Sequence, residues 1–361
     1  MENAPLTEYI PMIQEVTIEN FKGIKHCEIK DLAKINLFIG RNSSGKSSIM
    51  EAIYYTGREF LETSLPLCLQ RRSNRSGVSA RELWYGYLMN SNVNVKLGFN
   101  EQDYTEMRMQ FSPTENKVLV YLGSGSPTSK GGMDLLCTYN KSSFSLATGR
   151  RTTDIISPHS EQIRQYFENS IFIDPNIKTD MRSVEGKYLN LVKLAEETSS
   201  DLAKKTAAIY GTEPSWEFLP HPDFSSDTPS RFTILEGRRR LFLDNFGDGL
   251  HYGLAILAIA KTRNNTALFV EEIESHQHAE AIKNLISALL EIAKKNNLQL
   301  FITSHNQSVW NYLYYYYRSP EEREEEFRCF NITKDKDSGE VKATIEKGIS
   351  NIQPDLEGRP Q

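Results

Sequence analysis

Residues 40–47 read Gly-Arg-Asn-Ser-Ser-Gly-Lys-Ser, which matches the pattern G-x-x-x-x-G-K-S. They follow a short, mostly apolar run, residues 35–39, that is typical of a β-strand, and they precede residues 47–55, whose apolar positions recur at helical spacing. A glycine-rich loop between a strand and a helix is the context in which this pattern forms a phosphate cradle, the P-loop. Its glycines permit backbone angles and close approaches that a Cβ would forbid. The sequence therefore predicts a nucleoside triphosphate site at this loop.

Each part of the P-loop has an expected task in binding a triphosphate. The loop N–H groups and the N-terminus of the following helix face the anion. Lys46 is expected to reach the β- and γ-phosphates, and the Ser47 hydroxyl to bind Mg²⁺. The residues expected to bind the nucleotide are Gly40, Arg41, Asn42, Ser43, Ser44, Gly45, Lys46, Ser47 and Ser48. The loop by itself leaves the reaction open.

The size and composition of the chain are those of a globular protein with a sizeable core. Its 361 residues suffice for one large or two medium domains, with 39% hydrophobic and 25% charged residues. No apolar run is long enough to span a membrane, and residues 1–5 lack the features of a signal peptide. Four scattered cysteines without a CxxC pair favour reduced thiols. We therefore expect a cytoplasmic protein that does not contact membranes.

The net charge of −5 argues against a protein that coats nucleic acid with its whole surface. A local basic site remains open because arginines gather twice along the chain, although either group can equally be a solvated face. The first group is Arg71, Arg72, Arg75 and Arg81, and the second is Arg238, Arg239 and Arg240. An acidic run at residues 321–326 is expected to be an exposed helix surface.

The first two thirds of the chain change from strand patterns to helical patterns. Residues 12–30 favour two strands. Residues 93–147 favour a series of short strands, the last near residues 144–146, separated by turns such as 123–127, which together suggest an antiparallel sheet. Residues 160–212 favour helices, and the Pro-, Ser- and Asp-rich stretch that follows them (213–230) favours a loop.

From residue 241 onward, strands alternate with helices, which implies parallel pairing and right-handed crossovers. Residues 254–259 and 278–294 favour helices, whereas residues 267–270 and 298–303 favour strands, and residues 331–333 and 341–345 favour a hairpin around residues 337–339. The predicted nucleotide core is therefore split between the two ends of the chain. We divide the chain into an N-terminal lobe with the P-loop and the antiparallel β region (1–150), a helical insertion or lid (151–235) and a C-terminal lobe (236–361).

Two consecutive carboxylates follow the predicted buried strand at residues 267–270. Glu271 is placed where a Mg²⁺ partner is needed, at the end of a strand beside the P-loop strand. The next carboxylate, Glu272, can polarise the attacking water as a general base. His305 follows the other core strand, where it can sense the γ-phosphate or orient the water. The alternatives are a strand that simply ends in surface charge and a histidine that is structural.

A second glycine turn precedes an apolar helix. Gly247, Asp248 and Gly249 open this helix and so form another N-terminus that can bind an anion. Because one chain needs only one phosphate cradle, a second one suggests a site that a partner subunit completes. A capped tight turn is the alternative.

Taken in order, the motifs at residues 40–47, 247–249, 270–278 and 303–306 resemble an ABC-type ATPase of the SMC/RecF/OLD branch. More narrowly, they resemble the OLD-like "AAA family" ATPases of prokaryotic antiviral defence systems. Residues 18–24 are similar to that family's first strand and turn. The resemblance covers the ends of the chain well and the middle only by general layout. It implies an α/β ATPase head with a mixed β-sheet core, an antiparallel β subdomain and a helical insertion.

The resemblance also implies roles for the residues of these motifs. Lys46 and Ser47 would bind phosphate and Mg²⁺, with Glu271 on the Mg²⁺ side of the site. Glu272 would be the catalytic base, and His305 the switch residue. The turn at residues 247–249 would cap ATP that is bound to the opposite subunit. The family therefore implies ATP and Mg²⁺ as ligands and a head-to-tail homodimer with two ATP molecules between its subunits.

The chain departs from the family pattern at several positions. Glu271 stands where many ABC proteins have Asp, although OLD-like members are similar in using Glu, and Ile273 replaces the usual Pro. The capping turn has Gly247 or Phe246 in place of the usual Ser, which removes a hydroxyl from the γ-phosphate and points to slow hydrolysis. Only a short tail follows His305, so we expect this protein to lack the Toprim nuclease domain that OLD nucleases carry.

Four functions are open at this point. The first is a Mg²⁺-dependent ATPase whose dimerisation drives a conformational change. The second is a slow or non-hydrolysing ATP-binding scaffold or sensor that controls a separately encoded nuclease or toxin. The third is a DNA-engaging, RecF/SMC-like repair ATPase, and a small-molecule kinase is the remaining P-loop alternative. We expect an ATP-driven dimer that serves as the ATPase or sensor component of an antiviral complex with a separate effector.

Overall fold

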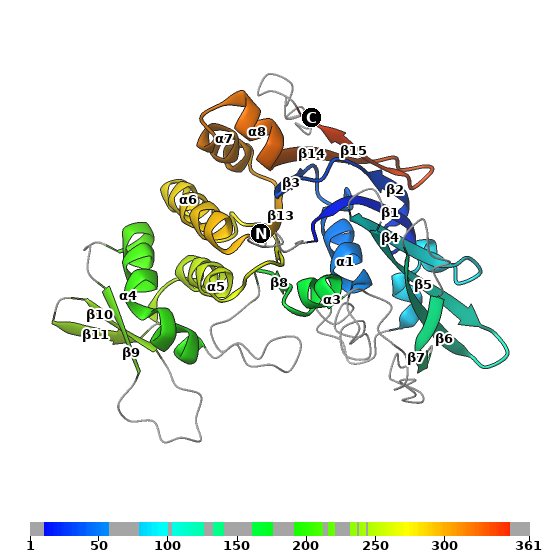
Figure 1. Cartoon of the computed structure of the whole chain (residues 1–361), viewed down its shortest axis with the longest axis horizontal. Coiled ribbons are helices and arrows are strands. Elements are labelled where there is room, and N and C mark those ends of the chain that lie inside the picture. The colour runs from blue at the N-terminus through cyan, green and yellow to red at the C-terminus, as the bar shows by residue number, and fades with distance from the viewer. Residues whose placement is uncertain are drawn as a thin grey trace, which may run out of the picture.

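Across the residues that it describes, the computed structural model shows an α/β fold built around two large β-sheets and one small one (Figure 1). It describes residues 11–57, 79–99, 103–125, 133–140, 161–175, 191–211, 216–220, 232–236, 238–242 and 245–346. The strand expected near residues 144–146 lies outside these ranges, and so do Arg71, Arg72 and Arg75.

The central sheet has the strand order β15-β14-β3-β13-β12-β8 and is mixed, because β15 is antiparallel to its neighbour and the other described strands are parallel. Its strands are β3 (Ile35–Ile39), β8 (Ile171–Ile173), β12 (Ala267–Val270), β13 (Gln299–Ser304), β14 (Phe327–Lys334) and β15 (Val341–Ile345). Every residue of β3, β12 and β13 is buried, as expected for parallel strands that are covered on both faces. The predicted core strands, their parallel pairing and the closing hairpin are confirmed.

An antiparallel sheet and one helix cover the first face of the central sheet. The antiparallel sheet has the order β2-β1-β4-β5-β6-β7, with β1 (Ile13–Phe21), β2 (Ile24–Ile29), β4 (Val93–Phe99), β5 (Asp103–Ser112), β6 (Lys117–Gly125) and β7 (Met133–Asn140). Helix α1 (Lys46–Thr56) contacts strands of both sheets and lies between them (Figure 1). Phe38, Phe269 and Phe301 of the central sheet belong to the same core. The predicted antiparallel region therefore supports the helix that follows the P-loop.

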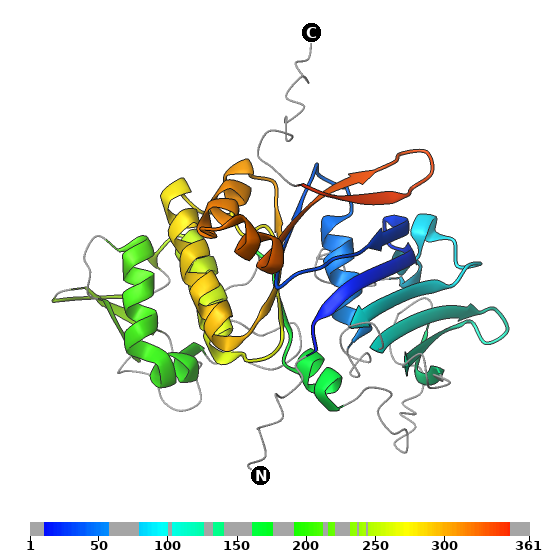
Figure 2. The same ribbon diagram turned by 45° about the horizontal axis from the view of Figure 1, so that its top comes forward.

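Helices cover the opposite face of the central sheet (Figures 1 and 2). They are α5 (Asp248–Thr262), α6 (Ala279–Asn296) and α7 (Gln307–Tyr316), while α4 (Leu191–Tyr210) packs on α5 and α6. Leu37, Leu268 and Ile302 join this second core, because successive strand residues point to opposite faces. Among the described helices, we find none with the length and apolar character needed to cross a membrane.

The remaining described elements are short, and α3 and η1 among them add buried side chains to the core under the antiparallel sheet. Strands β9 (Trp216–Pro220), β10 (Phe232–Glu236) and β11 (Arg239–Phe242) form a three-stranded antiparallel sheet next to α4. Helix α3 (Glu161–Glu168) precedes β8, and two 3-10 helices, η1 (Ala80–Leu83) and η2 (Tyr85–Tyr87), precede β4. The acidic run forms α8 (Pro320–Glu326), which buries none of its residues and so confirms the predicted exposed surface.

One buried amide joins the two large sheets. The side-chain oxygen of Gln299, in β13, accepts hydrogen bonds from the backbone N–H of Ile13 in β1 at 3.0 Å and from the hydroxyl of Tyr166 in α3. Its Nε2 donates to the carbonyl oxygens of Ile13 and Ala33 at 2.8 and 2.9 Å. Because buried amides are stable only when they are hydrogen-bonded, this network fixes β13 against β1.

The structure differs from the sequence-based expectations in several elements. Strand β8 lies in the segment predicted as helical, β9 lies in the predicted loop, and α7 was not predicted at all. Strand β6 continues through Gly125 although residues 123–127 favour a turn, because residues 123–125 pair with residues 104–106 of β5. The division of the chain at residues 150 and 235 stays a prediction.

Candidate functional site

The P-loop connects β3 to α1, and its backbone has the conformation that the glycine pattern predicts. Gly40 and Gly45 have φ angles of 146° and 109°, in the region where a Cβ is unfavourable. A Cβ on Gly40 would also lie 2.3 Å from the carbonyl oxygen of Ile332 in β14. Ser43 has a φ of 64°, which is uncommon for a residue with a side chain. Position 40 therefore needs glycine for both its backbone angle and the space around it.

Lys46 folds back over the loop. Its ammonium group donates to the carbonyl oxygens of Gly40 and Arg41 at 2.8 and 3.0 Å. Burial lowers the pKa of Lys46 from 10.5 to about 8, although three glutamates within residues 271–274 act in the opposite direction. An anion bound next to this amine would favour its charged form, as the glutamates do.

The groups around the P-loop fit a triphosphate and a magnesium ion. The Ser44 hydroxyl is buried and has no hydrogen-bond partner among the described residues, and the first turn of α1 carries no acidic side chain. Both features suit an anion at the N-terminus of the helix. The Ser47 hydroxyl and the buried Glu271 carboxylate offer the oxygen ligands that Mg²⁺ prefers.

The two predicted carboxylates follow β12, and three neighbouring elements hold their backbone. Glu271 donates its N–H to the carbonyl of Ile173 at 2.9 Å, and the Tyr252 hydroxyl donates to the carbonyl of Glu271. Glu272 has a φ of 48°, and its N–H donates to the Thr303 hydroxyl at 2.8 Å. Contacts with β8, α5 and β13 therefore fix the position from which the Glu272 side chain projects.

His305 connects the P-loop to Glu272. Its Nδ1 lies 3.3 Å from Nζ of Lys46 and 3.1 Å from the carbonyl oxygen of Gly40, and its Nε2 lies 3.6 Å from Oε1 of Glu272. An imidazole protonated at Nε2 accepts from Lys46 at Nδ1 and directs its N–H toward Glu272, whereas one protonated at Nδ1 donates to the carbonyl oxygen of Gly40. The structure thus brings together Lys46, Glu272 and His305, which we call the P-loop cluster, although Lys46 and His305 are 259 residues apart.

The second glycine turn opens α5, on the face of the sheet opposite to α1 (Figure 2). Gly247 is the N-cap of α5, and Asp248 lies in its first turn. The Gln277 side chain donates to the carbonyl of Gly249 at 2.6 Å, and a Cβ on Gly249 would lie 2.3 Å from the carbonyl oxygen of His276. Among the described residues, Gly249 therefore lies against His276 and Gln277, in the segment after β12. The structure does not bring the turn into the P-loop cluster.

Three further side chains support the cluster and were not predicted. The Glu274 carboxylate accepts the backbone N–H of His305 at 2.6 Å, and the Thr303 hydroxyl accepts from Glu272, as described above. Burial, and after it the charge of Asp174, raises the pKa of Tyr252 well above 10, so this hydroxyl stays protonated as a donor. Glu274 and Thr303 lie inside the predicted motifs, but the sequence does not indicate their hydrogen-bond partners. Nothing in the sequence singles out Tyr252.

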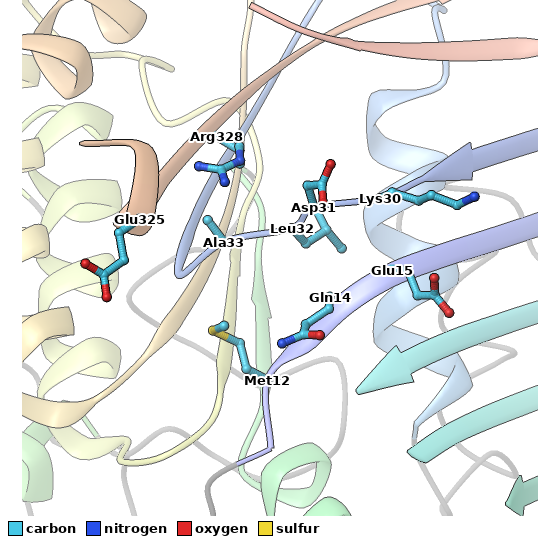
Figure 3. A pocket seen from close by; sticks show the side chains of 9 residues that line it. All are labelled: Met12, Gln14, Glu15, Lys30, Asp31, Leu32, Ala33, Glu325 and Arg328. Atoms are coloured by element: carbon cyan, nitrogen blue, oxygen red, sulfur yellow. The ribbon is translucent and has the colours of Figure 1, made fainter. Parts of the chain in front are cut away.

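A pocket of about 630 Å³ lies at the other end of the parallel strands (Figure 3). It adjoins the beginnings of β3 and β14, whereas the P-loop follows the end of β3. Its lining contains none of the predicted site residues and consists of Met12, Gln14, Glu15, Lys30, Asp31, Leu32, Ala33, Glu325 and Arg328. This pocket is therefore separate from the P-loop cluster.

The parallel core with a glycine-rich loop between β3 and α1 defines a P-loop nucleotide-binding protein. Residues 12–206, more than half of the chain, match the family described as "AAA ATPase domain", and the chain belongs to this family. ATP binding and ATP hydrolysis are accordingly its general function. Residues 141–311 also match a family described as "AAA domain, putative AbiEii toxin, Type IV TA system".

Two relatives illustrate the range of similarity. An "ATP/GTP phosphatase" of Helicobacter pylori is 21% identical over 334 residues, which cover 82% of this chain and 86% of the relative. The "DNA replication and repair protein RecF" of Vibrio parahaemolyticus is 32% identical over 92 residues, which cover 25% of this chain and 24% of RecF. The similarity to RecF is therefore local.

One similar solved structure is an Smc head domain from Pyrococcus furiosus with an extended coiled coil, bound to the C-terminal domain of ScpA. It aligns with this chain with a TM-score of 0.50. The alignment covers 93% of this chain and 96% of that chain at 13% sequence identity. At this identity the comparison concerns the fold alone. The predicted α/β head, with its mixed core, antiparallel sheet and helices, is confirmed as SMC head-like.

Proposed function

We propose that this chain is a Mg²⁺-dependent ATPase of the ABC type that hydrolyses ATP between two copies arranged head to tail. The observation that carries this proposal is the P-loop cluster, in which the imidazole of His305 lies 3.3 Å from the Lys46 amine and 3.6 Å from the Glu272 carboxylate. Membership of the AAA ATPase domain family supports the reaction, and the SMC head-like fold supports the type.

In the proposed site, Lys46 and the P-loop amides bind the β- and γ-phosphates. Ser47 and Glu271 would hold Mg²⁺, which neutralises charge on the phosphates when it is bound. Glu272 would orient the attacking water and accept its proton. The Ser275 hydroxyl donates to Oε2 of Glu272 at 3.2 Å, which restricts the carboxylate to one orientation.

The position of the second glycine turn supports the proposed dimer. Gly247, Asp248 and Gly249 lie at the start of α5, across the central sheet from the helix that follows the P-loop (Figure 2). In the proposed arrangement this helix N-terminus faces the triphosphate of the second copy. The turn offers backbone N–H groups but no hydroxyl, so we propose that hydrolysis is slow.

The hydrolytic function is tested by phosphate release from ATP and, because one relative is named an ATP/GTP phosphatase, from GTP. Lys46→Ala removes the phosphate-binding amine, and Glu272→Gln removes the base. We expect each change to lower turnover by at least about 100-fold. Matched controls are Lys283→Ala and Glu280→Gln, which change exposed side chains of α6 and should leave turnover unchanged.

Wild-type protein that releases phosphate no faster than Lys46→Ala, alone and with copurified partners, would contradict ATP hydrolysis. Nucleotide binding retained in that case would favour the alternative of an ATP-binding scaffold.

We also propose that the ATPase controls a separate effector, a nuclease or a toxin, in an antiviral defence complex. The resemblance of the motifs to OLD-like ATPases supports a defence complex, and the match of residues 141–311 to a family described as "AAA domain, putative AbiEii toxin, Type IV TA system" supports a place in a system that contains a toxin. The test is purification of tagged Glu272→Gln protein from its native host. A stoichiometric partner with nuclease or toxin activity is expected, and recovery of the homodimer alone before and during phage infection would contradict the proposal.

A DNA-engaging function is the second candidate. It is supported by the local similarity to RecF and by the exposed Arg238 and Arg239 at the β10–β11 hairpin. Titration with duplex DNA at several salt concentrations tests it, because phosphate contacts weaken with salt. Binding that Arg238→Glu and Arg239→Glu together remove would support this candidate, and no binding at low salt would exclude it.

A further inference from the structure

We propose that Glu274 is a positioning residue that holds His305 in the P-loop cluster; this inference rests on the proposed ATPase function. Oε1 of Glu274 accepts the backbone N–H of His305 at 2.6 Å across 31 residues of sequence. Hydrogen bonds to an ionised acceptor are shorter and stronger than those between neutral groups. Glu274 therefore anchors the backbone from which the imidazole of His305 projects.

The anchor lies where the two parallel strands separate. The paired register of β12 and β13 extends to Val270 opposite Ile302. Beyond that point, the N–H of Ile273 still reaches the carbonyl of Thr303, at 3.3 Å. The next connection between the two segments is made by the side chain of Glu274, which bonds the N–H of His305. A side chain thus continues the contact between two segments that the sheet no longer joins.

The segment that carries Glu274 is itself fixed by a tight turn. The N–H of Ser275 donates to the carbonyl of Glu272 at 2.7 Å, and the N–H of Gln277 donates to the carbonyl of Glu274 at 3.0 Å. Oε2 of Glu274 is buried and has no hydrogen-bond partner in the described part of the chain. Within that part, the hydrogen bonding of the carboxylate is therefore directed to His305.

The consequence concerns the imidazole. Its Nδ1 lies 3.3 Å from Lys46 and its Nε2 lies 3.6 Å from Glu272, so a shift of the His305 backbone changes both distances together. A displacement of about 1 Å in a catalytic group can lower a rate about 100-fold. Loss of the Glu274 acceptor should therefore impair turnover, whereas the P-loop keeps its own contacts with ATP.

The test compares Glu274→Ala, which removes the acceptor, with Glu274→Gln, which keeps an acceptor oxygen. We expect Glu274→Ala to lower kcat about 100-fold with little change in KM or in binding of ATP. Glu274→Gln should stay within about fivefold of wild type, because a neutral acceptor makes a weaker bond. Glu280→Ala, which removes an exposed carboxylate from the first turn of α6, is the matched control.

Two further measurements separate positioning from a general structural role. Glu274→Ala combined with His305→Ala should be no slower than His305→Ala alone, because both changes remove the same contribution. Without ATP, the imidazole NMR signals of His305, assigned by their loss in His305→Ala, should shift in Glu274→Ala and not in Glu280→Ala. If Glu274→Ala does not fold, Glu274→Asp, whose shorter side chain does not reach the N–H, takes its place.

A Glu274→Gln variant as slow as Glu274→Ala would overturn the proposal that Glu274 positions His305. It would mean that the negative charge of Glu274, and not its hydrogen bond to His305, supports turnover. An additive loss in the double variant, or unchanged kcat and unchanged imidazole signals in Glu274→Ala, would also overturn it. Absence of Lys46-dependent phosphate release in the wild type would contradict the proposed ATPase function. The NMR comparison would still test the contact with His305 in that case.

Discussion

At the scale of single residues, the P-loop contains one side chain in a conformation that favours glycine. Ser43 is exposed and has a φ of 64°. A left-handed conformation costs a residue with a Cβ about 1–2 kcal/mol, whereas glycine loses about 0.5–1 kcal/mol through conformational entropy. We therefore predict that Ser43→Gly raises the free energy of unfolding by up to about 1 kcal/mol, measured by urea denaturation without nucleotide.

The control for this prediction is Ser48→Gly, within α1, which should lower the free energy of unfolding by about 1 kcal/mol. An equal loss of stability in both variants would show that the backbone at Ser43 is not strained.

The buried thiol of Cys27 gives a second residue-scale prediction. Burial, with a smaller effect of Glu28, raises the pKa of Cys27 from 9.0 to about 12. The protonated thiol is not a nucleophile, so iodoacetamide at pH 8 should modify Cys27 only after unfolding, as read by mass spectrometry. The native state keeps a proton that the unfolded chain releases, so this contribution to stability is present below pH 9 and is lost as the pH rises toward 12. Rapid labelling of Cys27 in the folded protein would contradict the prediction that burial protects this thiol.

At the scale of elements, the start of α5 can accept a side chain at one glycine but not at another. Gly247 is an N-cap with φ −70° and ψ 159°, and no heavy atom lies within 4 Å of the position of its missing Cβ. Serine is favoured at such a position, so Gly247→Ser should raise the free energy of unfolding by a few tenths of a kcal/mol. Gly249→Ser should lower it by about 1–3 kcal/mol, because a Cβ would lie 2.3 Å from the carbonyl of His276. Thermal unfolding of Gly247→Ser and Gly249→Ser, each compared with the wild type, checks both expected changes in stability.

Gly247→Ser also tests the role proposed for this turn. It supplies the hydroxyl that ABC-type ATPases usually have there, so ATP turnover should rise if the turn faces the triphosphate of a second copy. A stable Gly247→Ser protein with unchanged turnover would argue against that role.

The elements that the sequence predicts well are those that a local pattern specifies. Residues 35–39, 267–270 and 298–303 are mostly apolar runs, and all three form buried strands. The meeting of His305 with the P-loop follows from the same prediction, because the carboxyl ends of parallel strands share one edge. Strand β8 was missed because a three-residue strand has no detectable period, and its pairing with β12 is non-local.

The contacts that the sequence could not predict are those set by register between distant segments. Glu274 bonds a backbone N–H after β13, and Gln299 bonds backbone groups at the start of β1. Neither residue type nor spacing identifies such partners, because they depend on where two strands stop pairing. The same holds for the Tyr252 hydroxyl, which reaches the carbonyl of Glu271 only because α5 packs against the end of β12.

At the scale of the whole molecule, α1 and α5, the two helices whose N-termini are expected to bind phosphate, lie on opposite faces of the central sheet (Figure 1). This placement supports a site that is shared between two copies. Glu272→Gln should bind ATP without hydrolysing it, so its mass in light scattering after gel filtration should double with ATP and Mg²⁺. Lys46→Ala should stay at the mass of one chain, and a single-chain mass for Glu272→Gln at saturating ATP would contradict the dimer.

The buried amide of Gln299 has a consequence for how the molecule can move. Its hydrogen bonds link β13 to β1 and to the segment before β3, so they hold the central and antiparallel sheets together inside the core. These sheets should resist hydrogen–deuterium exchange together and open in one cooperative step. We therefore expect a hinge that responds to nucleotide to lie among the helices on the other face of the central sheet, where α4 packs on α5 and α6.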